Sequence, residues 1–188
     1  MTNTKFIIKL AAILFAIAFV CTLILVVCNE ITEPVIAKLQ IQTENAAKTE
    51  VLPDAEGGFE DVKAEGVIEA YRGKDKAGKT VGYCFKTAPS GFGGAITMMV
   101  GVNTVGEVTG VKITEMAETP GLGAKSLDEN WIKQFINKKG NLSVTKTGNP
   151  GESEINAISG ATITSKAVTD GVNTAVKAAQ QLMAKEGK

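Results

Sequence analysis

The feature that most constrains this chain is an almost uninterrupted apolar run from Phe6 to Val27, in which Lys9 is the single charged residue. As a helix, about 22 residues rising roughly 1.5 Å each span about 33 Å, enough to cross the hydrocarbon core of a bilayer. A cleaved signal peptide has a shorter apolar region that ends at small residues, whereas this run ends Val26-Val27-Cys28. A lipid-attachment site at Cys28 is also disfavoured, because Val27 is bulkier than the small residue such sites carry. We therefore predict a retained membrane anchor.

The charges on either side of this run indicate its orientation. Lys5 and Lys9 precede or begin it, whereas Glu30 and Glu33 follow it. Basic residues favour the cytoplasmic side of a membrane-spanning helix. We therefore predict a cytoplasmic N-terminus and membrane helix over residues 1–28, a stalk or first domain helix over 29–57, and an extracytoplasmic domain over 58–188.

The segment after the anchor is predicted to form a second helix, from Thr32 to about Val51. Pro34 is acceptable in its first turn, and apolar residues follow at helical spacing. This helix is either a rigid stalk or the first helix of the domain, and both can hold. A cluster of helix breakers from Leu52 to Gly58 ends it.

The composition excludes several classes of function. The 188 residues carry 20 basic and 20 acidic side chains, so no overall positive charge favours nucleic acid. Histidine, the commonest metal ligand and general base, is absent. Cys21, Cys28 and Cys84 provide neither a disulfide framework nor a CxxC metal site, and Cys84 is predicted to be a buried, inert thiol. We expect neither a nucleic-acid partner nor a metal.

Alternating apolar residues predict four β-strands in two hairpins. Residues 67–72 and 80–86 form the first hairpin, and residues 95–102 and 107–113 form the second. Two consecutive hairpins favour an antiparallel sheet. Within the third strand, Met98 and Met99 are predicted to face the core or to lie at an edge.

Two further helices and a short strand are predicted after the sheet. Ser126-Leu127-Asp128-Glu129 has the pattern of a capping box, which indicates a helix from about Leu127 to Ile136 with Trp131 on its core side. Residues 142–146 are predicted to form a short strand. A C-terminal helix from about Ser165 to Lys185 is predicted to pack on the sheet through Val168, Val172, Ala175, Val176, Ala179, Leu182 and Met183. The predicted fold class is therefore α+β, with one membrane helix followed by a domain of antiparallel sheet and packed helices.

The start of this last helix is the most informative motif. Residues 158–165 read Ile-Ser-Gly-Ala-Thr-Ile-Thr-Ser, a crowded set of small and hydroxylated side chains. Such a turn at the start of a helix exposes unpaired N–H groups and the positive end of the helix dipole, which suits an anion such as phosphate. An ordinary helix start, with Thr162, Thr164 or Ser165 as N-cap, explains the same residues.

Ser159-Gly160-Ala161-Thr162 resembles the flavinylation motif of a family of FMN-binding membrane subunits. The family comprises the RnfG subunits of the Rnf ion-translocating oxidoreductase and the corresponding FMN-binding subunits of the Na⁺-translocating NADH:quinone reductase, and this short chain fits the RnfG type better. The resemblance implies that Thr162 carries FMN through a phosphoester bond made by a flavin transferase that uses FAD. The chain departs from the family at Asn156, where an Asp is usual. Since the transferase recognises this position, the resemblance predicts weaker flavinylation.

Two glycine-rich segments extend the resemblance. Residues 89–94, Pro-Ser-Gly-Phe-Gly-Gly, are explained by flexibility or by close approach of the backbone to a ligand, and the family tends to carry a similar loop here. Residues 118–125 begin with a Glu-Thr-Pro-Gly-Leu-Gly segment that otherwise reads as a turn between a strand and a helix. In the family this segment lines the flavin. The resemblance thus implies cofactor contacts from Glu118, Thr119, Pro120, Gly121, Leu122 and Gly123, besides Ser159, Gly160, Ala161 and Thr162.

No acid–base pair or nucleophilic triad is visible, which favours electron relay over hydrolysis. The resemblance implies an electron-carrying subunit of an Rnf-type translocase that couples electron transfer between ferredoxin and NAD to sodium or proton transport, without a complete active site of its own. Its expected partners are the other subunits, the flavin transferase and membrane lipid. The alternatives are the counterpart from the quinone reductase and a membrane-anchored, non-redox module that binds another anionic ligand.

Overall fold

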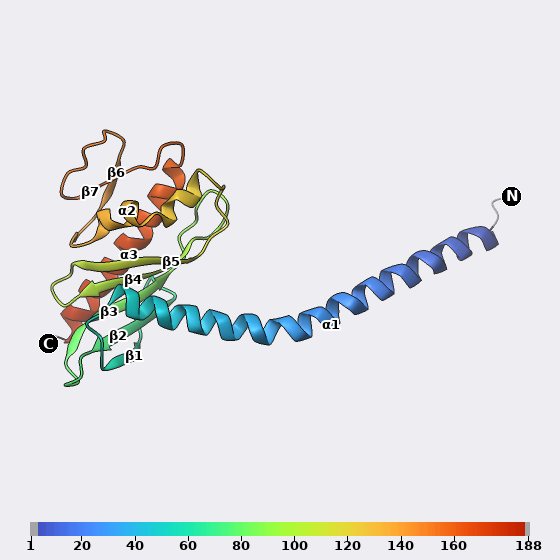
Figure 1. Ribbon diagram of the computed structural model, residues 1–188, viewed down its shortest axis with the longest axis horizontal. Helices are drawn as coiled ribbons and strands as arrows, with labels where there is room; N and C mark the ends of the chain where they lie inside the picture. Colours follow the sequence, from blue (N-terminus) through green and yellow to red (C-terminus); the bar gives the residue numbers. More distant parts are fainter. Residues whose placement is uncertain (1–3, 187–188) are drawn as a thin grey trace. The chain divides into compact units, whose positions relative to one another are not determined.

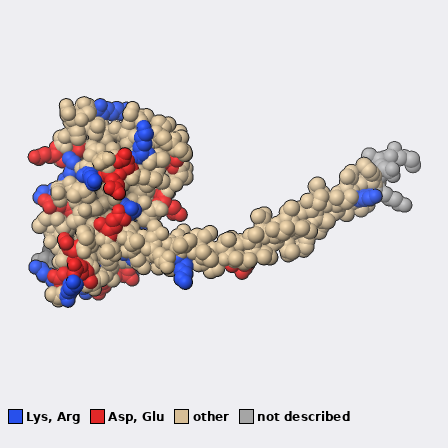
Figure 2. Space-filling view, viewed as in Figure 1, with Lys and Arg blue, Asp and Glu red and all other residues tan. Residues whose placement is uncertain are grey.

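The computed structural model describes residues 4–186, which form two compact units, one ending at Thr43 and the other beginning at Glu44. Helix α1 (Thr4–Val51) crosses this boundary. Its part in the first unit is exposed, and with a mean hydropathy of 3.1 in its apolar window the helix is long and apolar enough to cross a membrane. Figure 2 shows few charges on this helix surface and many on the second unit.

Helix α1 is continuous, so the prediction of a separate helix beginning at Thr32 is wrong. Pro34 lies inside the helix rather than in a first turn. A proline removes one backbone N–H donor from the helical ladder, but the residues on both sides remain helical. Close to the proline, the Thr32 hydroxyl donates to the carbonyl oxygen of Cys28 at 2.8 Å.

The second unit is built on a five-stranded antiparallel sheet in the order β1-β2-β3-β4-β5 (Figure 1). The predicted hairpins are β2–β3 and β4–β5, which confirms the antiparallel sheet. The edge strand β1 was not predicted, because Phe59 and Val62 are its only large apolar residues and pairing with β2 defines it. The strands are β1 (Gly58–Val62), β2 (Glu69–Lys74), β3 (Thr80–Thr87), β4 (Thr97–Asn103) and β5 (Val108–Glu115).

Helix α3 (Thr162–Glu186) covers one face of the sheet and closes the larger core (Figure 1). Tyr83 and Phe85 of β3 and Val100 of β4 point to this face and are buried. The predicted packing of α3 is confirmed, since its apolar stripe lies in or against this core, with Met183 only partly buried. The helix begins at Thr162, so a cap at Thr162, Thr164 or Ser165 is ruled out; the residue before the helix is Ala161, whose carbonyl accepts from the Ser165 N–H.

The last turns of α1 cover the opposite face with a smaller apolar cluster. Ala47, Val51 and Leu52 pack with Cys84 and Met99. The two predicted core methionines are therefore both buried, on opposite faces of β4, because successive side chains of a strand alternate. Burial raises the pKa of the Cys84 thiol to about 12, only partly offset by the nearby Lys48 charge, which confirms a buried, unreactive cysteine.

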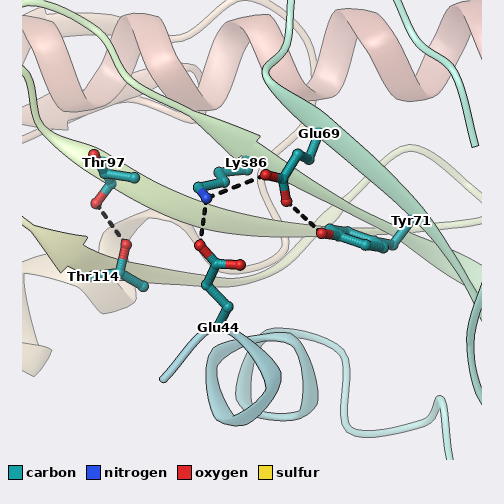
Figure 3. Close-up of polar contacts among 6 residues, drawn as sticks. All are labelled: Glu44, Glu69, Tyr71, Lys86, Thr97 and Thr114. Atoms are coloured by element: carbon teal, nitrogen blue, oxygen red, sulfur yellow. Dashed lines mark hydrogen bonds and ion pairs between the residues drawn. The ribbon is translucent and has the colours of Figure 1, made fainter. Parts of the chain in front are cut away.

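A group of charged side chains borders this smaller cluster (Figure 3). The Lys86 ammonium lies between the carboxylates of Glu44 and Glu69, and the Tyr71 hydroxyl donates to Glu69. The Lys48 ammonium lies 3.7 Å from the centre of the Tyr71 ring. Burial by itself would lower the pKa of Lys86, but its hydrogen bonds and charge interactions with the two carboxylates outweigh this and raise the pKa.

The helix predicted over residues 127–136 is broken into three short pieces. They are η1 (Gly123–Leu127), α2 (Glu129–Ile132) and η2 (Lys133–Phe135). The N-cap of α2 is Asp128, whose side chain accepts from Asn130 N–H, and not Ser126, whose hydroxyl donates to the Gly123 carbonyl inside η1. Trp131 packs against the core and its ring meets Phe135 edge-on, as expected of a core residue.

A two-stranded parallel pair completes the domain. The predicted short strand is β6 (Ser143–Thr145), and its partner β7 (Glu154–Asn156) was not predicted. Side chains of the neighbouring segments fix both strands. Asn173 of α3 exchanges two hydrogen bonds with the backbone of Leu142, and the Trp131 indole donates to the Asn156 carbonyl at 2.8 Å.

Candidate functional site

Three segments that are far apart in the sequence meet at the start of α3. They are the glycine-rich loop at residues 91–94, the turn at residues 118–123 and the motif at residues 159–164. Together they surround a cavity of about 440 Å³. Its lining residues are Phe92, Glu118, Thr119, Leu122, Gly123, Lys146, Gly160, Ala161, Thr162, Ile163 and Thr164.

The carboxylate of Glu118 joins these three segments. One oxygen accepts from the backbone N–H groups of Phe92 (2.7 Å) and Gly93 (3.0 Å), and the other accepts from the Thr164 hydroxyl (2.8 Å). Glu118 is only 8% exposed. Its oxygens are thus engaged by the protein, so its role at the cavity is to hold the loop, the turn and the helix together.

The electrostatics of Glu118 agree with this role. Burial alone would raise the pKa of the carboxyl, but the hydrogen bonds from Gly93, Thr164 and Phe92 outweigh it and hold the pKa below its ordinary value. The group therefore stays ionised at neutral pH, as an acceptor for all three donors.

Glycine is required at two positions, one beside this carboxylate and one in the motif. A Cβ at Gly123 would overlap an oxygen of Glu118 and lie 2.8 Å from the Thr164 hydroxyl, so a side chain there would displace the carboxylate. Gly160 has a φ of 77°, a left-handed conformation that glycine adopts without strain. The two glycines thus allow the turn and the motif to approach each other closely.

The hydroxyls of the motif are used in different ways. Thr164 is buried and bonded to Glu118; Ser165 is buried, accepts from the Ile158 N–H at 3.0 Å and donates to the Ala161 carbonyl at 2.9 Å. Thr162 is half-buried, and within residues 4–186 its hydroxyl has no hydrogen-bond partner. The motif therefore leaves Thr162 free while its neighbours brace the helix start.

A second cavity of about 440 Å³ lies on the other side of Thr162. It is formed by the segment that leads from β7 into the motif and by the residues after β6. Lys146, Gly160 and Thr162 line both cavities. The remaining lining residues of the second cavity are Gly148, Asn156, Ala157, Ile158 and Ser159.

The structure gathers most of the residues singled out from the sequence. Glu118, Thr119, Leu122, Gly123, Gly160, Ala161 and Thr162 line the first cavity, and Ser159 lines only the second. Pro120 and Gly121 line neither and are exposed. Lys146, Ile163 and Thr164 were missed as site residues. Thr164 carried a signal, since it is two residues from Thr162 in the hydroxyl-rich motif, whereas Lys146 carried none beyond its position at the end of a predicted strand.

The cavity suits a planar ring that bears an anionic group. Phe92, Leu122 and Ile163 are exposed apolar side chains on its walls, which suit an aromatic ring. The first N–H groups of α3 lack intrahelical partners and its first turn has no acidic residue, which suits a phosphate. The residues present therefore fit FMN, with Thr162 where the phosphate end would lie.

Comparison with known proteins gives matches along the chain. The family model described as FMN-binding domain matches residues 91–177, and the one described as RnfG N-terminal region matches residues 1–51. The RnfG protein of the Na⁺-translocating ferredoxin:NAD⁺ oxidoreductase complex of Acetobacterium woodii is 41% identical, over 95% of this chain and 94% of that one. The corresponding protein of the proton-translocating complex of Clostridium ljungdahlii is 36% identical, over 85% and 84%.

Solved structures share the fold. The chain is similar to NqrC of Shewanella oneidensis, with a TM-score of 0.53 and 22% identity over 62% of this chain and 59% of that one. It is also similar to the equivalent protein of the Na⁺-translocating NADH-quinone reductase of Parabacteroides distasonis, with a TM-score of 0.50 and 22% identity over 61% of each chain. At this identity the likeness establishes the α+β fold alone.

Proposed function

Because the chain belongs to the RnfG family of ion-translocating ferredoxin:NAD⁺ oxidoreductase complexes, we propose that it carries electrons on an FMN bound covalently to Thr162. The complex would couple electron transfer between ferredoxin and NAD to sodium or proton translocation, as the names of the relatives say of theirs. The FMN-binding domain match and the apolar walls of the cavity support the cofactor. The flavin supplies the redox chemistry, and the chain holds and positions it.

The observation that carries this proposal is the free hydroxyl of Thr162. It lies at the start of a 25-residue helix and on the boundary of two cavities, while the hydroxyls of Thr164 and Ser165 are bonded within the protein. Ser159 is also without a hydrogen-bond partner among residues 4–186, but it borders only the second cavity. Thr162 is therefore the hydroxyl best placed to be esterified.

The attachment step balances with FAD as the flavin donor. The Thr162 oxygen attacks the phosphorus on the flavin side of the diphosphate, and a new P–O bond forms. The bond from that phosphorus to the oxygen of the AMP phosphate breaks, AMP leaves, and the hydroxyl proton passes to solvent. No electrons are exchanged, and a flavin transferase is the partner expected to bind FAD for this step.

The membrane arrangement follows from the apolar helix and its flanking charges. We propose that residues 1–28 form the cytoplasmic N-terminus and the membrane span, that 29–57 connect it, and that the FMN domain over residues 58–188 is extracytoplasmic. The exposed apolar surface of α1 supports an anchor in lipid. Protease accessibility of the domain in right-side-out and inverted vesicles tests the sidedness, and cleavage confined to inverted vesicles would reverse it.

Co-expression of the full chain with a flavin transferase tests the covalent site. In-gel fluorescence and intact mass should show one FMN, less one water, on the natural protein and on Ser159→Ala. Thr162→Ser should retain part of the modification, because it keeps a hydroxyl, and Thr162→Val should carry none. A full adduct on Thr162→Val would refute the site, and an unmodified natural protein would favour a module that binds its ligand non-covalently.

Asn156 offers a second test of the same chemistry. Its backbone is fixed by Trp131 and Gln134, and the residue lines the second cavity beside Thr162. With transferase limiting, Asn156→Asp should raise flavin occupancy, because the family usually presents a carboxylate here to the transferase. Equal occupancy of the two proteins, measured by the ratio of flavin absorbance to protein, would contradict this prediction.

A further inference from the structure

Lys146 stands apart among the residues around Thr162. It is the single cationic residue among the described residues that line the two cavities, and it lines both, as Thr162 does. Glu118 is the single carboxylate in these linings, and its oxygens are occupied by Phe92, Gly93 and Thr164. Within residues 4–186 no carboxylate forms an ion pair with Lys146. Its positive charge is therefore available to a ligand at Thr162.

The small parallel pair explains how Lys146 reaches this position. Thr145 of β6 lies opposite Asn156 of β7, and the Thr145 carbonyl accepts from the Ala157 N–H at 2.8 Å. Because the two strands are parallel, the residues that follow them leave the same edge side by side. Lys146 thus follows β6 at the point where Ala157 begins the segment that leads to Thr162.

The strands that carry Lys146 are themselves held by the domain. Asn173 of α3 exchanges hydrogen bonds of 2.7 and 2.8 Å with the backbone of Leu142 just before β6. On β7, the Asn156 carbonyl accepts from Trp131 and its N–H donates to Gln134, both at 2.8 Å. The backbone at Lys146 is therefore fixed relative to the start of α3, although its side chain is exposed.

We propose that Lys146 is a phosphate-binding residue, which pairs with the phosphate of FMN at Thr162. This inference rests on the proposed function. Charge-assisted contacts to phosphate oxygens are among the stronger polar interactions of proteins, and lysine supplies a point charge on a flexible stem that can follow the phosphate. Lys146 favours binding of the flavin before attachment and neutralises the single negative charge of the phosphodiester afterwards.

Non-covalent binding to Thr162→Val separates phosphate contacts from ring contacts, because this variant cannot be esterified. FMN and riboflavin share the ring and differ in the phosphate. Lys146→Gln should weaken FMN binding about three- to tenfold and leave riboflavin binding unchanged, and the difference should shrink at high salt. Lys146→Arg should restore most of the FMN affinity. An equal loss for both ligands, or no loss for FMN, would overturn the proposal.

Lys166 provides the matched control. It is an exposed lysine on α3, four residues after Thr162, and it lines neither cavity. Lys166→Gln removes the same charge from a nearby surface position and should leave FMN affinity unchanged. An equal effect of Lys166→Gln and Lys146→Gln would assign the effect to the general charge of the domain and would contradict a specific role for Lys146.

Attachment to the full chain gives an independent measurement. With FAD and limiting flavin transferase, Lys146→Gln should acquire flavin about three- to tenfold more slowly than the natural protein, and Lys166→Gln should match the natural protein. An unmodified natural protein would refute the proposed function itself. A modified natural protein with an unchanged rate for Lys146→Gln would refute only the role of Lys146.

Discussion

The two faces of the five-stranded sheet are closed in different ways. On the α3 face the core is large, and every member is apolar, including Phe85, Val100 and Val172. On the α1 face the cluster is small and is bordered by charged groups, with Lys86 held between Glu44 and Glu69. The α3 face therefore determines the fold, and the α1 face determines how the last turns of the long helix are attached to it.

This difference matters for function because the site belongs to the first face. Thr162 and Thr164 begin the helix whose later residues close the large core. The position of the reactive hydroxyl is thus fixed by apolar packing, which is insensitive to pH and salt. The attachment of α1 depends partly on ion pairs, which are sensitive to both.

The largest expected effect comes from truncating one core residue on each face. Phe85→Ala should lower the free energy of unfolding by about 4 kcal/mol and Met99→Ala by about 2 kcal/mol, since the smaller cluster has fewer neighbours to lose. Denaturant unfolding of the full chain in detergent, followed by the fluorescence of the single tryptophan, Trp131, measures both. Equal losses would contradict the difference between the faces.

Hydrogen exchange sharpens the same comparison. Met99→Ala should increase amide exchange in residues 44–51 while α3 stays protected, because the truncated side chain packs in the smaller cluster with α1. Phe85→Ala should increase exchange in α3. The same exchange pattern in both variants would show that the two faces open together.

Glu118→Gln is expected to have an intermediate effect. An amide cannot accept from two backbone N–H groups and a hydroxyl as a carboxylate does, so stability should fall by about 2 kcal/mol. Flavin occupancy should fall as well, because the loop, the turn and α3 are no longer held together. Thermal unfolding and flavin absorbance measure the two effects, with the exposed Glu115→Gln as control.

The pH dependence of this variant has a definite sign. The pKa of Glu118 is lowered in the folded protein, so its carboxylate contributes stability above the ordinary pKa of 4.5, and this contribution is lost as pH falls below it. The gap between the natural protein and Glu118→Gln should therefore be constant at neutral pH and shrink in acid. A gap that grows in acid would show that the carboxyl is bound in its protonated form.

The smallest effect is expected from Lys86→Gln, at about 1 kcal/mol, because the pair is partly exposed. The pKa of Glu69 is lowered, first by the Tyr71 hydroxyl and, against the cost of burial, by Lys86, while the pKa of Lys86 is raised above 10.5. The contribution should be present from roughly pH 5 to 10 and be lost below that range as the carboxylates protonate. Unfolding at several pH values and at high salt measures it, and an effect that persists in acid would contradict an ionic origin.

The sequence was sufficient for the elements with strong local patterns. Alternation identified the two hairpins, and helical spacing identified the face of α3 that packs on the sheet. The elements it did not identify depend on partners distant in the sequence: β1 is defined by pairing with β2, and β7 by pairing with β6. Ser126 shows the same limit, because its hydroxyl bonds inside η1 and so the capping-box pattern does not start a helix there.

The site follows the same rule. The motifs were visible as glycine and hydroxyl clusters, but their joining by Glu118 requires contacts between residues 26 and 46 positions apart. The sequence placed Pro120 and Gly121 among the cofactor contacts because they share a segment with Leu122, whereas the turn keeps them out of the cavity linings. Lys146 has no motif around it, so only the parallel pair reveals it.

The continuity of α1 also decides where this protein can be separated from lipid. A fragment that begins at Gly58, after the breakers at residues 52–58, would lose Val51 and Leu52 and expose Met99 to water. A fragment that begins at Glu44 would retain the apolar cluster and the acidic partner of Lys86. A detergent-free preparation should therefore keep the last two turns of the anchoring helix.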